Sequence, residues 1–203
     1  MTGKIAGFDF GLKTFLTGAD KKKIISPEFF KKSLRKLKRA YKTLSRKNRE
    51  KARINLARIY KKLSNCRKDF FFKLSHALTD KYDYLFLEDL NLKAMQKLWG
   101  RKISDLAFAE FILILKHVAK KKGKIVHQIN RFFPSSKLCS HCNYKNKTLS
   151  LKERVWICPS CNKEHNRDVN AAINNLREGA SSLGLDIVRP DSSGEYCLNP
   201  ESN

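Results

Sequence analysis

Acidic residues are scarce in this sequence of 203 residues, which holds 19 Asp and Glu against 43 Lys and Arg. The formal net charge of +24 is far larger than solubility requires. A charge of this sign and size indicates a polyanionic partner, which is either nucleic acid or an anionic membrane face.

Long apolar runs, proline and glycine are also scarce. The longest apolar stretch, residues 106–115, is about half of what a bilayer requires and contains Glu110, which excludes a membrane span. With 5 Pro and 9 Gly beside 13 Phe, the composition is that of a chain that buries a core and not of a disordered basic tail. The first twenty residues lack the basic start and apolar run of a secretory signal.

The positive charge is concentrated in one part of the chain. Residues 31–73 hold 18 Lys and Arg against Glu50 and Asp69, a net charge of +16. Apolar residues at helical spacing over 30–44 and 56–78 predict two amphipathic helices that turn near 47–50 and form an antiparallel hairpin. Most charge runs are solvated faces, but so dense a block repels itself and favours a polyanion.

The rest of the chain alternates between strand and helix patterns. A β-hairpin is expected at the start, with a third strand after it, and two buried strands follow the helical hairpin. The expected strands are 4–10, 14–18, 22–25, 82–87 and 124–129, and the further helices are 104–122 and 169–176. Strands alternating with long helices predict an α/β or α+β domain. The last 24 residues are acidic and rich in Pro and Gly, and we expect a loose appendage.

Four of the six cysteines form two Cys-x-x-Cys pairs that are fifteen residues apart, a spacing typical of a tetrahedral zinc site with thiolate ligands. Asn143 and Asn162 follow the pairs, where a left-handed residue is needed. Redox dithiols or incidental cysteines are the alternative, and His141 or His165 could replace one ligand. We expect one structural Zn²⁺ held by Cys139, Cys142, Cys158 and Cys161, with Cys66 and Cys197 as idle thiols.

A few carboxylates stand at the ends of predicted elements in this basic chain. Asp9 ends the first strand, Glu88 and Asp89 end the strand before residue 90, and Asp168 opens the last helix. If they converge, their mutual repulsion would be relieved by two divalent ions about 4 Å apart, which also support phosphodiester hydrolysis. The alternative is that Asp168 caps its helix while Asp9 and Asp89 have turn roles.

Several segments together carry a family resemblance. Gly-Phe-Asp-Phe-Gly-Leu-Lys-Thr-Phe-Leu-Thr (7–17), Phe-Leu-Glu-Asp-Leu-Asn (86–91) and Asn-Arg-Asp-Val-Asn-Ala-Ala-Ile-Asn (166–174) resemble the three RuvC motifs of TnpB/OrfB proteins. Those are transposon-encoded, RNA-guided nucleases similar to compact type V CRISPR effectors. Phe-Pro-Ser-Ser-Lys-Leu-Cys-Ser-His-Cys (133–142) resembles the start of their zinc ribbon.

The resemblance implies an α/β, RNase H-like (RuvC) fold with Asp9, Glu88 and Asp168 as catalytic residues that bind two Mg²⁺. Glu88 is preferred to Asp89 because it occupies the family position, and adjacent strand residues point to opposite faces. The expected organisation is a nuclease core with an inserted basic hairpin, a zinc ribbon, a final RuvC segment and a flexible tail. These span 1–135 (hairpin 28–79), 136–165, 166–185 and 186–203.

The implied partners are DNA and a guide RNA or RNA–DNA heteroduplex, with no membrane, and the implied location is the cytoplasm, at the nucleoid of a prokaryote or with a mobile element. Cations that would contact phosphates without reading bases are Lys31, Lys32, Arg35, Lys38, Arg39, Lys42, Arg46, Arg131, Lys137 and Arg167. Trp99, Phe132, Phe133 and Trp156 could stack on bases, although core packing is the more common role of such residues.

Two functions are therefore weighed. The first is a Mg²⁺-dependent DNA endonuclease core of the TnpB/OrfB type. The second is a nucleic-acid-binding accessory protein, regulator or remnant of a transposon that does not cut. The chain starts almost at the first RuvC motif, so we expect the family's N-terminal half, which recognises the guide and the target-flanking motif, to be missing.

Overall fold

The computed structural model describes residues 2–47, 49–91, 97, 106–150, 152–188, 190 and 194–199. Its main sheet has six strands, five of them in the order β3-β2-β1-β4-β5. Strand β1 pairs antiparallel with β2 and parallel with β4, and β4 pairs parallel with β5. The bounds are β1 (Lys4–Phe10), β2 (Thr14–Gly18), β3 (Lys23–Ile25), β4 (Tyr84–Glu88) and β5 (Ile125–Ile129).

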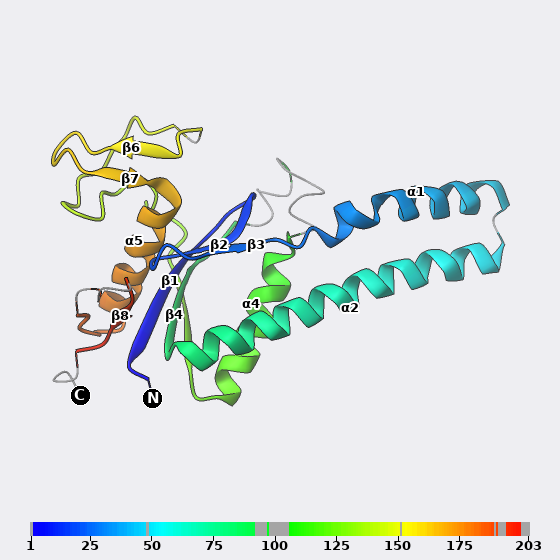
Figure 1. Ribbon diagram of the computed structural model, residues 1–203, viewed down its shortest axis with the longest axis horizontal. Helices are drawn as coiled ribbons and strands as arrows, with labels where there is room; N and C mark the ends of the chain where they lie inside the picture. The colour runs from blue at the N-terminus through cyan, green and yellow to red at the C-terminus, as the bar shows by residue number, and fades with distance from the viewer. Residues whose placement is uncertain are drawn as a thin grey trace.

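Helices cover both faces of this sheet (Figure 1). The C-terminal half of α2 (Glu50–Lys81) and α4 (Phe108–Lys121) pack on one face, and α5 (Arg167–Ser182) packs on the other. The mixed α/β class is thus confirmed. None of the described helices has the combination of length and hydropathy that crossing a membrane requires.

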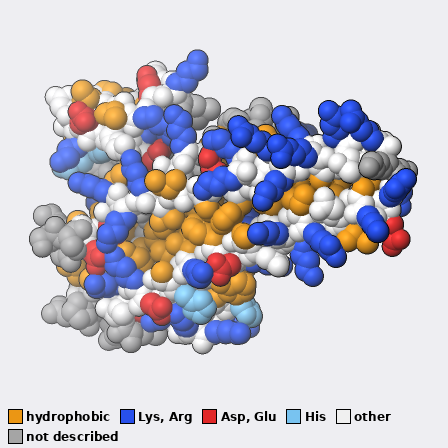
Figure 2. All heavy atoms as spheres, turned by 45° about the vertical axis from the view of Figure 1, so that its right-hand side comes forward, with side chains coloured by type: hydrophobic (Ala, Val, Ile, Leu, Met, Phe, Trp, Pro, Cys, Tyr) orange, Lys and Arg blue, Asp and Glu red, His pale blue; other side chains and the backbone are white. Residues whose placement is uncertain are grey.

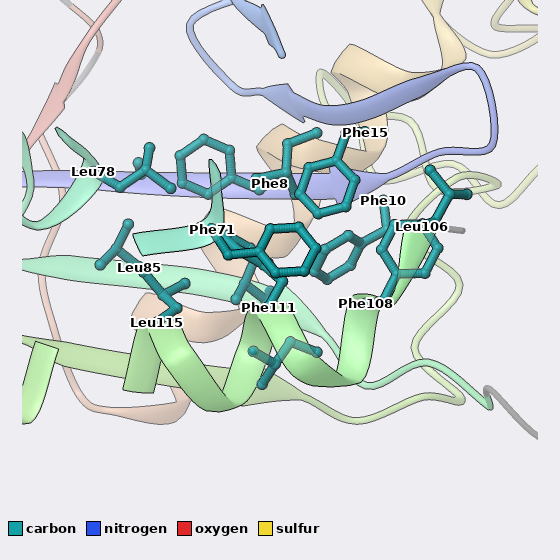
Figure 3. Packing of buried hydrophobic residues seen from close by; sticks show 14 of the residues in the cluster. Phe8, Phe10, Phe15, Phe71, Leu78, Leu85, Leu106, Phe108, Phe111 and Leu115 are labelled. Carbon is teal, nitrogen blue, oxygen red and sulfur yellow. The ribbon is translucent and has the colours of Figure 1, made fainter. Parts of the chain in front are cut away.

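Alternating side chains of each strand enter two separate cores. In β1, Ala6, Phe8 and Phe10 face α2 and α4, whereas Ile5 faces α5. The first core is unusually aromatic (Figure 3). The ring of Phe15 lies 5.6 Å from Phe71, 5.4 Å from Phe108 and 5.1 Å from Phe111, between centroids. Such ring pairs add stability beyond the area that they bury.

Helix α5 lies very close to the sheet because each side of the interface has a glycine where the other side comes nearest. A Cβ on Gly7 of β1 would lie 2.3 Å from the carbonyl oxygen of Ala172, and one on Gly179 of α5 would lie 2.1 Å from the Phe86 ring. Neither distance is possible for a real Cβ, so each position requires glycine. The Asn175 side chain also donates a hydrogen bond of 2.9 Å to the carbonyl of Phe8.

The basic hairpin extends away from the sheet (Figure 1). Helix α1 (Phe29–Lys47) runs back along α2, and the turn falls at 47–50 as predicted. Between Phe29 and Phe70, the buried hydrophobic residues among those described are Leu37, Ala40 and Ala52. The apolar contact between the two helices is therefore narrow. Many Lys and Arg side chains lie on its surface, beside exposed hydrophobic ones (Figure 2).

The cysteine-rich segment forms a separate small unit, here called the zinc module (residues 136–166), that lies above the start of α5 (Figure 1). Its strands β6 (Val155–Ile157) and β7 (Glu164–Asn166) flank the second cysteine pair.

The acidic C-terminal segment is not a loose appendage in its described part, and the prediction of a flexible tail is wrong for 194–199. Strand β8 (Tyr196–Cys197) pairs antiparallel with β1 at Lys4 and Ile5, and Tyr196 is buried. Glu195 binds Lys4 at 2.8 Å. The acidic composition had indicated a solvated tail, but Glu195 instead forms an ion pair with Lys4 of β1.

The predicted helices differ from the observed ones mainly at their ends. Helix α5 is longer than the predicted 169–176 at both ends. Helix α4 begins at Phe108, after Ala107 in a left-handed conformation. The start predicted for it at 104 lies outside the described residues.

Candidate active site

Three carboxylates that are far apart in the sequence line one pocket of about 250 Å³. Asp9 comes from the end of β1, Glu88 from the end of β4, and Asp168 from the first turn of α5. Asp9 shares its sheet face with Ile5, and Glu88 shares its face with Phe86, because strand side chains alternate. The parallel pairing of β1 and β4 then brings both carboxylates to the same end of the sheet.

Asn166 determines how α5 begins. Its side-chain oxygen accepts a hydrogen bond of 3.2 Å from the Val169 N–H, so Asn166 is the N-cap of α5. The alternative that Asp168 caps this helix is therefore wrong. The Asp168 carboxylate instead contacts Arg154 Nη1 at 3.0 Å and Arg167 Nε at 3.8 Å.

The electrostatics of the pocket disfavour the ionised forms of two of these acids. Burial raises the pKa of Asp9 well above its usual value, and the charges of Glu88 and Asp168 raise it further. Arg167 and Arg154 act in the opposite direction with smaller effects. Burial raises the pKa of Glu88 to about 7, although the Phe10 N–H hydrogen bond to its carboxylate lowers it. Such carboxylates suit a divalent cation, since it favours their charged forms.

Asp89 lies outside this arrangement. It follows β4, its N–H donates to the Ile129 carbonyl at 3.0 Å, and its carboxylate accepts from Arg131 Nε at 2.9 Å. Asp89 does not line the carboxylate pocket, whereas Glu88 does.

Arg154 was not among the predicted site residues. This residue stands just before β6 in the zinc module and reaches across to Asp168, fourteen positions later. Nothing in the sequence distinguishes it from the other cations. The buried asparagines of α5 were also missed. Asn170 and Asn174 each donate to the carbonyl of Leu138, at 2.7 and 2.6 Å, and so attach the zinc module to α5. Their signal was visible, because asparagine is a poor residue for a helix interior.

The four cysteines of the zinc module fit a tetrahedral metal. Their sulfur atoms all lie within 4.8 Å of one another, and in the described part of the chain no other set of His, Cys, Asp or Glu meets that criterion. The Cys139–Cys161 and Cys142–Cys158 sulfur distances are 3.7 and 3.6 Å. Thiolates at 2.3 Å from a tetrahedral Zn²⁺ would stand about 3.8 Å apart, whereas a disulfide requires about 2 Å.

The backbone around the cysteines repeats in the two knuckles. Asn143 and Asn162 have φ of 63° and 54°, which confirms the predicted left-handed conformations. The N–H of Asn143 donates to the Cys139 carbonyl and that of Asn162 to the Cys158 carbonyl, both at 2.9 Å. His165 Nε2 lies 3.0 Å from the Cys139 sulfur, so His165 contacts one of the four cysteines, and four sulfurs are already enough for a tetrahedral site.

Comparisons with known proteins agree with this arrangement. Residues 1–98 match a family model described as "Probable transposase" (OrfB_IS605), and residues 108–175 match the Cas12f1-like TNB domain. A protein of Streptomyces pristinaespiralis named "Putative RNA-guided DNA endonuclease" is 36% identical over 93% of this chain and 49% of its own length. The chain is a TnpB-type protein.

Other relatives and solved structures extend the likeness. "TnpB-like protein L79" of Acanthamoeba polyphaga mimivirus is 31% identical over 67% of this chain and 27% of its own length. A Cas12f1–sgRNA–target DNA complex matches 87% of this chain and 50% of its own with a TM-score of 0.63 and 20% identity. A CRISPR-Cas12f ternary complex matches 87% of this chain and 39% of its own, with a TM-score of 0.67 and 21% identity. The fold thus resembles Cas12f, and the chain spans half or less of the length of these relatives.

The cations predicted to contact nucleic acid have different surroundings. The seven on the hairpin are exposed, and Lys31 pairs with Glu28 at 2.9 Å. Arg131 pairs with Asp89, Lys137 is half-buried, and Arg167 lines the carboxylate pocket.

The aromatic residues predicted to stack on bases differ clearly in their exposure to solvent. Trp156 is buried in the small core of the zinc module, and Phe133 packs partly against the α5 core. Phe132 is 86% exposed, and its N–H donates to the Asn130 side chain at 2.9 Å. Trp99 lies outside the described residues. Of the three that are described, only Phe132 presents its ring to solvent.

Proposed function

We propose that this chain is the RuvC-type, RNase H-like nuclease part of a TnpB-type RNA-guided DNA endonuclease. The observation that carries the proposal is the pocket formed by Asp9, Glu88 and Asp168, which come from three different elements of the fold. Burial of Asp9 and Glu88 and the repulsion at Asp9 are typical of functional sites, and divalent cations would offset both.

In this proposal, Asp9, Glu88 and Asp168 hold Mg²⁺, in two positions as the sequence resemblance implies. Mg²⁺ bound there would activate a water and stabilise the leaving oxygen of a phosphodiester. All available donors in the pocket are hard oxygen ligands, which is the preference of Mg²⁺. The Phe10 N–H donates a hydrogen bond to the Glu88 carboxylate and favours its charged, metal-binding form.

Arg154 and Arg167 would bind the negative charge of the substrate phosphate. Both line the pocket and both contact Asp168 before a substrate arrives. When a phosphate enters, each guanidinium can exchange part of its contact with Asp168 for the phosphate oxygens, for which its fork of donors is well suited.

The zinc module contributes Arg154, so its folding is part of the active site. We propose that one structural Zn²⁺ holds it through Cys139, Cys142, Cys158 and Cys161. Its buried core is too small to fold alone, and metal binding would supply the folding free energy. Metal analysis of the purified protein should find about one zinc per chain, and Cys158→Ser should abolish it.

The partners in this proposal are nucleic acids. The two Cas12f structures that share the fold are complexes, one of them with sgRNA and target DNA. The exposed lysines and arginines of the hairpin can track a sugar–phosphate backbone without reading its sequence. DNA and a guide RNA are therefore the partners proposed for this chain.

The test is Mg²⁺-dependent cleavage of single- and double-stranded DNA by the protein purified with any bound RNA. Asp9→Ala should lower the cleavage rate by about 1,000-fold or more, because the pocket loses a metal ligand. Asp89→Ala is the matched control, since Asp89 is also an acid at the end of β4 but lies outside the pocket. Unchanged cleavage by Asp9→Ala would contradict the proposal.

One observation favours the second function, binding without cutting. Arg154 already forms an ion pair with Asp168, and this contact competes with metal. In that case the wild-type protein would bind DNA or RNA and show no cleavage at any Mg²⁺ concentration.

A further inference from the structure

A second, larger pocket of about 540 Å³ lies against α5, and its lining shares no residue with the carboxylate pocket. Four parts of the chain line it: the β2–β3 turn with the start of β3, the zinc module, one face of α5, and Tyr196 of β8. In Figure 1 the zinc module lies directly above the start of α5. We call this second pocket the side pocket. The charged residues that line it are Lys21, Lys23, Lys163, Arg177 and Glu164.

The side pocket carries an excess of positive charge. Four cations face one carboxylate, Glu164, which leaves a formal charge of +3. Among the described residues, Lys21, Lys23 and Lys163 form no ion pair. Arg177 donates through Nη1 to the Ser140 carbonyl in the first knuckle, and its guanidinium has further donors.

The three lysines at the β2–β3 turn differ in their partners. Lys22 binds Asp20 at 3.3 Å and Glu195 at 3.4 Å, whereas its neighbours Lys21 and Lys23 line the side pocket. Lys21 also has a φ of 64°, a left-handed conformation that costs a residue with a Cβ about 1 kcal/mol.

We propose that the side pocket binds adjoining backbone phosphates of a nucleic-acid strand, about one for each of its three lysines, outside the catalytic pocket. The partner class rests on the proposed function. Lysine and arginine from separate elements can surround a phosphate, and Val169, Ile173 and Tyr196 supply an apolar wall for the adjoining sugar. The volume is that of a site for a ligand of nucleotide size.

The test is the salt dependence of binding to a labelled single strand, measured by fluorescence anisotropy without Mg²⁺ so that no cleavage occurs. The variant is Lys21→Ala/Lys23→Ala/Lys163→Ala. Each phosphate contact adds about 0.7 to the slope of log K against log salt for a single strand, so the slope should fall by about 2. Strands of DNA and RNA with the same sequence are compared, and a fall with either identifies the source of the phosphate.

The matched control is Lys120→Ala/Lys121→Ala, two exposed lysines of α4 on the other face of the sheet. An unchanged slope in the triple variant, or an equal loss per lysine in the control, would overturn the proposal. Because Lys163 lies in the zinc module, Lys21→Ala/Lys23→Ala is measured as well, with an expected fall of about 1.4.

Failure of this proposal is distinguishable from failure of the proposed function. Binding is measured without metal and does not depend on cleavage, so a protein that never cuts can still show the loss. Conversely, a protein that cuts through Asp9 but keeps its full salt slope in both lysine variants would retain its proposed function and exclude the side pocket as a phosphate site.

Discussion

Two groups of carboxylates lie near opposite ends of β1 and have opposite surroundings. At the start of the strand, Asp20 and Glu195 lie among Lys4, Lys22 and Lys81. Hydrogen bonds from Lys4 and Lys81 lower the pKa of Glu195 to about 2. At the end of the strand, burial raises the pKa of Asp9, and Glu88 and Asp168 add to the rise.

The comparison shows that the chain's excess charge is placed selectively. With a net charge of +24, cations are available for every acid, and the first group receives three lysines. The second group has two arginines at Asp168, which offset less of the pKa rise at Asp9 than burial and the neighbouring acids cause. A folded protein tolerates such a cost where function requires it, and the function proposed for this group is cation binding.

The largest effect on stability should come from breaking the contact that brings α5 to β1. Gly7→Ala would place a Cβ 2.3 Å from the Ala172 carbonyl oxygen, and the overlap should lower the free energy of unfolding by about 3 kcal/mol. Urea denaturation measures this loss. In the control Gly123→Ala, no atom lies within 4 Å, and only its φ of +65° costs about 1 kcal/mol. Equal losses in the two variants would contradict the close packing.

The burial of the Glu88 carboxylate predicts a gain of stability when its charge is removed. The folded pKa of Glu88, about 7, lies above its ordinary value of 4.5, so ionisation costs stability as pH rises from 4.5 to 7, and the full cost remains above 7. Glu88→Gln should therefore raise the free energy of unfolding by about 2 kcal/mol at pH 8 without added Mg²⁺, and by less at pH 5.5. A loss of stability at pH 8 would contradict this account.

Glu195, whose carboxylate is bound by lysines, predicts the opposite dependence of stability on pH. Since the folded pKa of Glu195, about 2, lies below its ordinary 4.5, its stabilisation is present above 4.5 and lost as pH falls toward 2. Glu195→Gln should lower the free energy of unfolding by about 1 kcal/mol at pH 7, a modest value because the lysines are partly exposed. At pH 2 the two proteins should differ little. Thermal unfolding at several pH values distinguishes this from a pH-independent loss.

Charges on the hairpin should matter least for stability, because they face solvent. Lys38→Gln/Arg39→Gln/Lys42→Gln should change the free energy of unfolding by less than about 0.5 kcal/mol. The same variant should lower the slope of DNA binding against salt by about 2 to 3 if each residue contacts a phosphate. A full slope would show that this surface is only solvated.

Local sequence patterns made much of the fold predictable. Alternation and helical spacing indicated strands β1, β2, β4 and β5 and the hairpin turn, because those patterns depend on neighbours in sequence. The knuckle conformations of Asn143 and Asn162 followed from cysteine spacing. Glu88 and Asp89 could be assigned to different faces because side chains alternate along a strand.

What could not be predicted depends on contacts between distant segments. The pairing of β8 with β1 joins residues nearly two hundred positions apart, and its acidic surroundings gave the opposite indication. Arg154 has no local signal, since its role comes from the position of the zinc module over α5. Gly7 and Gly179 were visible in the sequence, but their necessity follows only from how closely the helix approaches the sheet.

The most direct test of the central claim is divalent-cation binding to the carboxylate pocket. Mn²⁺, which electron paramagnetic resonance detects and which can replace Mg²⁺, is titrated into the zinc-loaded protein and into Asp9→Asn/Glu88→Gln. The account predicts saturable Mn²⁺ binding by the wild type, weakened at least about 10-fold in the variant, which lacks two of the three proposed ligands. Equal Mn²⁺ affinity in the two proteins would contradict it.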